Sequence, residues 1–264
     1  HVPAPHPYAS GSPLSGEAYG RWCIEQTRRI IEREGPATIG ALFAEPVQGA
    51  GGVIVPPDGY LPALRALCRE HGILFVADEV ITAFGRVGTW FGSELWDLDP
   101  DLLCTAKGIT SGYLPLGATL VSDPIAGDLI DAGYFAHGFT YSGHPSACAA
   151  ALANLDLIER DGLIPRVRDD IGPLFQQRLH TFADHPAVAE IRGTGLIGAL
   201  ELTPGPRCDG RPPGPVLGAR AAALIREEGV IVRGIRDLIA LAPPLVISPA
   251  EIDTLFTAVR RGLD

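Results

Sequence analysis

The chain has 264 residues, a net charge of -10 at pH 7 and an isoelectric point near 5.1. This acidity argues against nucleic acid or an anionic membrane as the main partner, because both attract basic surfaces. No run of residues is apolar over the length needed to cross a bilayer. Five widely spaced cysteines without a C-x-x-C pair indicate reduced thiols in a cytoplasmic protein.

The first part of the chain alternates expected helices and strands. In order, the patterns predict an extended arm at 1–13, a helix at 14–34, a strand at 39–45, a helix at 59–71 and a strand at 73–78. Asp58 is a candidate cap for the second helix, and the glycine-rich stretch 48–52 predicts a turn. A strand, a helix and a strand at this spacing indicate a parallel βαβ unit.

The remainder of the chain divides into two expected parts. Beyond a loop at 81–99, the patterns predict a strand leading to Lys107, a strand at 117–121, a helix capped by Asp123, a helix from about 145 to 160 and further helix to about 180. A smaller α+β unit should follow, with strands at 188–192 and 196–202, a loop at 203–215 that we expect to be mobile, a helix at 216–228, strands near 230 and 238, and a terminal helix opened by a capping box at 248–251. We therefore predict a large domain at 1–170 and a small domain at 171–264.

Lys107 is the only lysine of the chain, whereas arginine occurs twenty times. It follows an apolar run that predicts a strand, and Asp78 ends an earlier apolar run. A lone lysine is most often a solvated surface residue, and the Asp-Glu pair at 78–79 could be no more than a polar strand end. The alternative is a reactive site, because ligands of α/β folds lie beyond the carboxyl ends of the strands.

A buried lysine and a strand-end aspartate together suit one cofactor chemistry. A lysine amine must be neutral to attack a carbonyl, and burial lowers its pKa from the free value of about 10.4. Pyridoxal phosphate uses such a lysine as its Schiff-base anchor, and an aspartate keeps its ring nitrogen protonated. The pair is sufficient to suggest this cofactor and insufficient to prove it.

Five stretches spread over nearly the whole chain form an ordered set. They are 44–52 (AEPVQGAGG), 76–80 (VADEV) with 84–86 (FGR), 105–108 (TAKG), 137–145 (HGFTYSGHP) and 242–246 (APPLV). In sequence and in order they resemble the class III, or omega, aminotransferases of pyridoxal-phosphate fold type I. The resemblance implies an α/β fold whose mostly parallel sheet has helices on both faces, followed by a C-terminal α+β small domain.

The resemblance also implies roles for single residues. Lys107 would form the Schiff base with the cofactor and then move a proton between the substrate carbon and the cofactor. Asp78 would pair with the pyridinium nitrogen, and Val80 would pack on one face of the ring. Thr140 would bind the phosphate of the cofactor in the neighbouring subunit, which makes a homodimer the functional unit.

Arg233 bears on the substrate. It matches the arginine that, in amine:pyruvate-type members of the family, swings in to hold a substrate carboxylate through two parallel hydrogen bonds; a surface arginine near a strand end is the alternative. The ornithine and 4-aminobutyrate branches usually have an arginine in place of Ala240 and a glutamine in place of Ile81. Both departures favour transfer from an amine or omega-amino acid to a keto acid such as pyruvate. Glu45 and Gln48 would line the floor of the site, with a solvated strand end as the alternative for both.

Other hypotheses remain open at this stage. A relative with the same fold could decarboxylate its substrate or move an amine within one molecule, and a truncated, cofactor-free chain could serve as a binding partner. The G-x-G-x-x-G pattern at 193–198 would indicate a dinucleotide enzyme only between a strand and a helix, and here it leads into an expected strand. His137 and His144 are not spaced as metal ligands, so we expect no metal.

The start of the chain predicts a missing portion. The family normally has an N-terminal part with a Ser/Gly-rich turn that binds the phosphate, and no such turn is visible in this sequence. The chain also contains no methionine, so His1 is not a translation start. We therefore expect a C-terminal portion of a longer enzyme, which by itself would bind the cofactor poorly.

Overall fold

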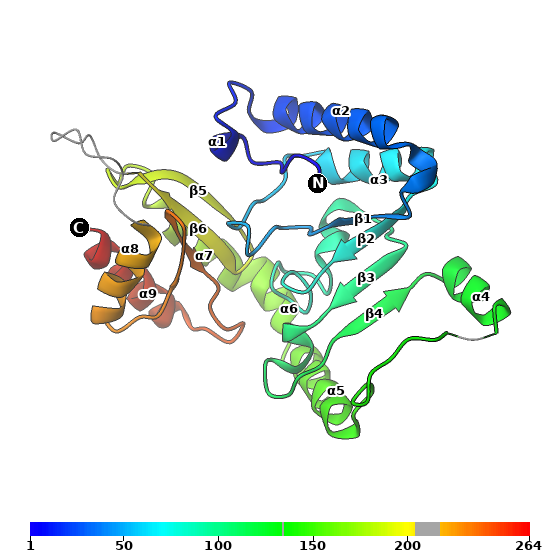
Figure 1. Cartoon of the computed structure of the whole chain (residues 1–264). Helices are drawn as coiled ribbons and strands as arrows, with labels where there is room; N and C mark the ends of the chain where they lie inside the picture. Colours follow the sequence, from blue (N-terminus) through cyan, green and yellow to red (C-terminus); the bar gives the residue numbers. More distant parts are fainter. Residues whose placement is uncertain (134, 204–216) are drawn as a thin grey trace. The chain divides into compact units, whose positions relative to one another are not determined.

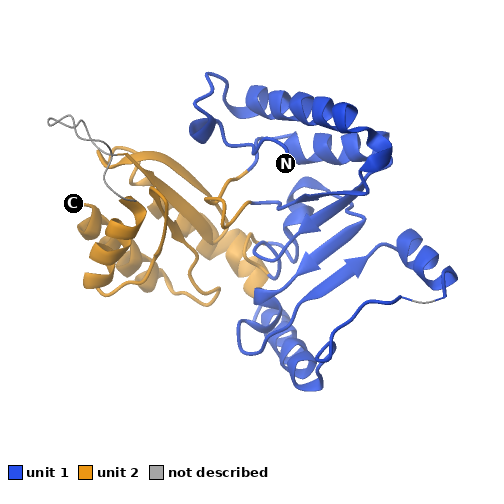
Figure 2. Ribbon diagram, viewed as in Figure 1, with its two compact units in different colours: residues 1–47, 56–84, 89–162 blue, residues 48–55, 85–88, 163–264 orange. Residues whose placement is uncertain are grey.

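The computed structural model of the chain describes residues 1–133, 135–203 and 217–264, and it contains two compact units (Figure 1, Figure 2). The first unit comprises residues 1–47, 56–84 and 89–162, and the second comprises residues 48–55, 85–88 and 163–264. The sequence predicts a domain boundary at 170, whereas the main division between the units falls at 162. Two short segments of the predicted large domain also join the second unit. The loop predicted at 203–215 lies outside the described residues except for Thr203.

The first unit is built on a four-stranded sheet with the order β1-β2-β3-β4. Its strands are β1 (Ala41–Ala44), β2 (Leu74–Asp78), β3 (Leu102–Thr105) and β4 (Ala118–Val121). The first three run parallel, and β4 is antiparallel to β3. Helix α3 (Tyr60–Glu70) connects β1 to β2, so the predicted parallel βαβ unit is confirmed.

Helices α2 (Gly16–Glu34) and α3 lie side by side and cover one face of this sheet (Figure 1). The apolar residues of α3 recur at helical spacing, and Leu61 and Leu64 are buried with Phe75 of β2. Helix α2 ends at Gly35, which has a φ of 86°, as the Gly-Pro stop signal predicts. The same core contains Cys23 and Cys68, and burial raises the pKa of each thiol to about 11.

The other helices of the first unit are shorter or lie near the sheet edges. They are α1 (Pro7–Ser10), α4 (Asp123–Asp131), α5 (Pro145–Arg160) and three 3-10 helices at Pro36–Thr38, Gly92–Trp96 and Lys107–Thr110. The predicted arm at 1–13 is therefore wrong in part, since it contains α1. Two predicted caps are also wrong. Gly59 caps α3 without a side-chain bond from Asp58, and Ser122 caps α4 while Asp123 is its first residue.

The second unit is the predicted α+β unit. Its antiparallel sheet has the order β5-β6-β8-β7, with β5 (Val188–Thr194), β6 (Ile197–Leu202), β7 (Arg233–Ile235) and β8 (Leu238–Leu241). Its helices are α6 (Leu163–Arg166), α7 (Gly172–His180), α8 (Leu217–Glu227) and α9 (Pro249–Leu263), with a π-helical stretch at Val167–Ile171. The strand predicted near 230 begins three residues later, at Arg233.

The core of the second unit explains its turns and caps. The rings of Phe175 in α7 and Phe256 in α9 pack against each other at a tilt of 55°, with centroids 5.2 Å apart, in the core of this unit. Ser248 and Glu251 form the capping box predicted for α9. The G-x-G-x-x-G pattern forms the hairpin between β5 and β6, so it has no dinucleotide-binding context. Among the residues that the structure describes, no helix combines the length and apolar character needed to cross a membrane.

Candidate active site

Three parallel strands end at one edge of the first sheet. Glu45 directly follows β1, Asp78 is the last residue of β2, and Lys107 lies two residues beyond β3. Because these strands are neighbours and run in the same direction, the structure brings the three predicted residues to the same sheet edge. Carboxyl ends of parallel strands are the usual place for ligands in α/β folds.

Asp78 is half-buried, and its Oδ1 accepts a hydrogen bond of 3.1 Å from the backbone N–H of Val80. This bond closes an Asx-turn, in which an aspartate side chain accepts a hydrogen bond from the backbone N–H two residues later. It fixes the direction of the carboxylate where β2 ends. Val80 is also half-buried and begins the loop that follows.

Glu79 is a residue of this region to which the sequence analysis gives no role. It is fully buried, and its carboxylate accepts hydrogen bonds from the backbone N–H groups of Gly92 at 2.7 Å and Ser93 at 2.6 Å. The hydroxyls of Ser93 and Thr82 also donate to it. All four of these donors come from the loop that follows β2. Glu79 therefore fixes the loop 80–93 from within.

Lys107 lies in an exposed position with a left-handed backbone, at a φ of 43°. The sequence-based expectation of a buried lysine is thus wrong for the described chain. The predicted strand ends at Thr105, and the chain then turns into the 3-10 helix Lys107–Thr110. Exposure leaves the amine accessible to a carbonyl compound.

The other predicted site residues lie apart in the chain. Thr140 is exposed on the loop before α5, in the first unit. Gln48 forms a two-way backbone bridge with Ile54, and Arg233 is exposed at the start of β7. Both of these residues belong to the second unit, whereas Lys107 belongs to the first.

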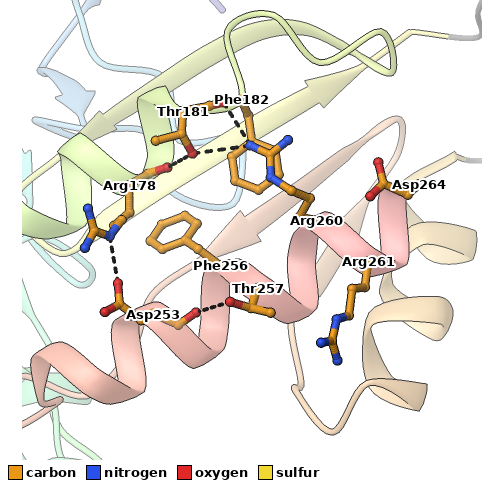
Figure 3. A pocket seen from close by; sticks show the side chains of 9 residues that line it. All are labelled: Arg178, Thr181, Phe182, Asp253, Phe256, Thr257, Arg260, Arg261 and Asp264. Atoms are coloured by element: carbon orange, nitrogen blue, oxygen red, sulfur yellow. Dashed lines mark hydrogen bonds and ion pairs between the residues drawn. The ribbon is translucent and has the colours of Figure 1, made fainter.

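A surface hollow of about 420 Å³ lies in the second unit between α7 and α9 (Figure 3). None of the predicted site residues lines it. Arg178 donates to Asp253 at 2.7 Å, and the guanidinium of Arg260 lies 4.4 Å from the ring centre of Phe182. Because these arginines already have partners within the unit, the hollow gives no support for an anion site.

The donor set at the sheet edge fits an aldehyde-bearing pyridine cofactor. An accessible primary amine can condense with the aldehyde, and a carboxylate on the adjacent strand can hold a proton on a ring nitrogen. Asp78 supplies the carboxylate as the last residue of β2, and Lys107 supplies the amine two residues beyond the end of the neighbouring β3.

Comparison with known proteins supports the same assignment. The family model "Aminotransferase class-III" matches residues 2–263. The chain is 43% identical to a putrescine–pyruvate aminotransferase of Pseudomonas aeruginosa over 264 residues, which cover all of this chain and 58% of that protein. It is 42% identical over 271 residues to a mitochondrial gamma aminobutyrate transaminase of Solanum lycopersicum, of which it covers 52%.

Solved structures give the same result. An (S)-enantioselective omega-transaminase from Thermomicrobium roseum is 46% identical, with a TM-score of 0.91 over all of this chain and 59% of that one. The chain therefore spans a little over half the length of the relatives it matches. The likeness confirms the type I transferase fold, and the match over nearly the whole chain shows that it belongs to the class-III aminotransferase family.

Proposed function

We propose that the protein containing this chain is a pyridoxal-phosphate-dependent transaminase. It transfers an amino group from an amine or omega-amino acid to a keto acid such as pyruvate, in two half-reactions. The observation that carries the proposal is the placement of Lys107 and Asp78 beyond the ends of adjacent parallel strands, in a member of this family. The name of the Pseudomonas aeruginosa relative supports pyruvate as the acceptor.

The predicted site residues have distinct parts in the proposed reaction. Pyridoxal phosphate, when bound, supplies an electron sink for cleavage of the substrate C–H bond. Lys107 Nζ would anchor the cofactor. In the first half-reaction it would carry a proton from the donor carbon to the cofactor, and in the second it would carry a proton from the cofactor to the carbon of the keto acid. The Asp78 carboxylate holds a proton on the ring nitrogen, and Val80 packs on one face of the ring. Glu45 and Gln48 line the floor of the site.

Arg233 is the proposed carboxylate-binding residue. Its strand places it opposite Ala240 in the pairing of β7 with β8. The methyl group of Ala240 cannot bind a carboxylate, whereas the guanidinium of Arg233 can. A guanidinium can hold a carboxylate by two parallel bonds and can move aside for an apolar amine. This arrangement supports a site that accepts both kinds of donor.

A homodimer is the proposed functional unit, with Thr140 binding the phosphate in the partner's site. Large apolar side chains are exposed around Thr140, including Phe135 at 62%, Phe139 at 73% and Tyr141 at 74%. Apolar groups gathered in this way are typical of a surface that another protein covers. A cytoplasmic location is also proposed. It is supported by the free thiols of the cysteines that the structure describes, which are Cys23, Cys68, Cys104 and Cys148.

Borohydride reduction of the full-length protein with bound cofactor tests the proposal. We expect intact mass and peptide mapping to show one reduced pyridoxyl phosphate adduct, on the peptide that contains Lys107. The variant Lys107→Ala should carry none and should lose transaminase activity by at least about a thousandfold. A cofactor-saturated protein with Lys107 unmodified would refute the proposal. Release of carbon dioxide from the donor would point instead to a decarboxylase.

The role of Arg233 has its own test. Arg233→Ala should raise KM for pyruvate and for omega-amino acids by roughly tenfold to a hundredfold, because a bidentate charged pair is lost. KM for a donor amine without a carboxylate should change little. The matched control is Arg226→Ala, which removes an exposed arginine from α8. An equal rise in KM for both kinds of donor would exclude a carboxylate-specific role.

A further inference from the structure

The turn that presents Lys107 has an unusual backbone. Lys107 has a φ of 43° and Ser111 a φ of 49°, so two non-glycine residues in the left-handed region frame the 3-10 helix between them. Side chains rarely adopt this conformation without support from the surrounding structure. The Thr110 hydroxyl closes the far end of the turn by donating to Leu114 O at 2.6 Å.

The support comes from Asn154, in the middle of α5. Its amide Nδ2 donates to Gly108 O at 2.9 Å and to Ile109 O at 3.2 Å, and its Oδ1 accepts from the Ser111 hydroxyl at 2.7 Å. One side chain therefore binds three of the four residues that follow Lys107. Gly108 O already accepts from the Ser111 N–H at 3.2 Å, so the amide adds a second donor there and supplies one to Ile109 O at the end of this short helix.

We infer that Asn154 is a positioning residue for Lys107, and this inference rests on the function proposed above. The lysine side chain has four flexible methylene groups, so its amine can be placed reproducibly only if the backbone from which it starts is fixed. Asn154 joins that backbone to α5, and Asn154 itself needs no contact with the cofactor. A carboxamide suits the task because it offers donors to the carbonyls and an acceptor to the hydroxyl.

The test compares three variants of the full-length protein with its cofactor. Asn154→Asp keeps the shape of the side chain and its acceptor but removes both donors and places a carboxylate against two carbonyl oxygens. Ser111→Ala removes only the hydroxyl bond. The matched control is Asp156→Asn, which makes the reverse change at an exposed position of the same helix.

Two readouts separate positioning from plain stability. Hydrogen exchange of the amides of 107–113 is measured in the cofactor-free protein, and the circular dichroism of the bound cofactor reports the orientation in which the lysine holds it. For Asn154→Asp we expect roughly tenfold faster exchange in this segment, about the effect of one or two lost hydrogen bonds. We also expect a changed dichroism band and a lower kcat with KM nearly unchanged. Ser111→Ala should show a smaller effect, and Asp156→Asn none.

The outcomes distinguish this inference from the proposed function. If the parent protein gives no borohydride adduct on Lys107, the proposed function fails and the inference fails with it. If the parent gives the adduct but Asn154→Asp leaves exchange, dichroism and kcat like those of the parent, only the inference is overturned. The inference is also overturned if exchange accelerates while dichroism and kcat stay unchanged, because Asn154 would then only tie α5 to the turn.

Discussion

The turns after β2 and β3 of the first unit are stabilised by different kinds of contact. The loop after β2 is held from inside by Glu79, which is fully buried and accepts from two backbone N–H groups and two hydroxyls. The turn after β3 is held from outside by Asn154, a partly exposed side chain on another helix. The first turn follows the residue proposed to bind the ring nitrogen, and the second presents the residue proposed to bind the aldehyde.

The difference follows from what each proposed role requires. A carboxylate that holds a ring proton must keep one fixed direction, and a buried hydrogen-bond network beside it resists movement. An amine that accepts and donates protons must reach several atoms. Its turn therefore needs a fixed backbone and a side chain that is free to move. We therefore expect the loop after β2 to contribute far more to the stability of the unit than the turn after β3.

Removal of Glu79 should produce the largest effect. Glu79→Ala leaves the buried N–H groups of Gly92 and Ser93 without an acceptor. Each unsatisfied buried donor costs about 1–3 kcal/mol, so the free energy of unfolding should fall by about 3–5 kcal/mol. Urea unfolding of the cofactor-free protein measures this loss.

Glu94 provides a matched control for that prediction. It is an exposed carboxylate in the 3-10 helix Gly92–Trp96 at the end of the loop, and its Oε1 accepts from the N–H of Phe91 at 2.8 Å. Glu94→Ala should cost about 1 kcal/mol or less, because water can replace the lost acceptor. Equal losses for Glu79→Ala and Glu94→Ala would show that the buried network does not stabilise the loop.

Added volume tests the same loop more gently. A Cβ on Gly92 would lie 2.8 Å from Thr82 Cβ and 3.0 Å from Glu79 Oε2. Gly92→Ala should therefore destabilise the unit by about 1–3 kcal/mol, as overpacking usually does. Gly127→Ala is the control, since a Cβ there meets nothing within 4 Å in helix α4 and should be neutral or slightly stabilising. A Gly92→Ala variant as stable as the parent would mean that the loop accommodates the added methyl group at little cost in stability.

Much of this unit could be predicted from local sequence. The apolar runs that end in Asp78 and before Lys107 predict strands, and the structure contains both strands and pairs them in parallel. Gly35 and the capping box at Ser248 marked helix ends because such signals act within a few residues. The ordered motifs predicted the family before any contact was known, and the match over the chain confirmed it.

Contacts between distant residues could not be predicted in this way. Glu79 meets its backbone donors 13 and 14 residues later, and Asn154 meets Gly108 across 46 residues, so neither contact leaves a local pattern. The apolar run before Lys107 predicts a buried residue. The structure differs because the chain turns after the run, and Lys107 is exposed in that turn. Asp58 is a good capping residue, but Gly59 adopts the left-handed conformation and takes that position.

The smallest effect is expected in the turn after β3, where Gly108 faces the other loop. A Cβ on Gly108 would lie 3.2 Å from Phe84 Cδ2 and 3.3 Å from Phe84 Cβ. The tight contact should cost stability, while alanine restricts the unfolded chain and returns about 0.4–1 kcal/mol, so Gly108→Ala should change the free energy of unfolding by less than about 1 kcal/mol.

Urea unfolding and borohydride trapping of the same Gly108→Ala sample decide what that contact does. If Gly108→Ala leaves the free energy of unfolding nearly unchanged and still forms the Lys107 adduct, the turns after β2 and β3 are stabilised independently of each other. A loss as large as that of Gly92→Ala would show that Phe84, which has a φ of 62° within the loop after β2, couples the two turns. In that case the ring-nitrogen side and the amine side of the proposed site would move together, and the buried network around Glu79 would also set the position of the lysine.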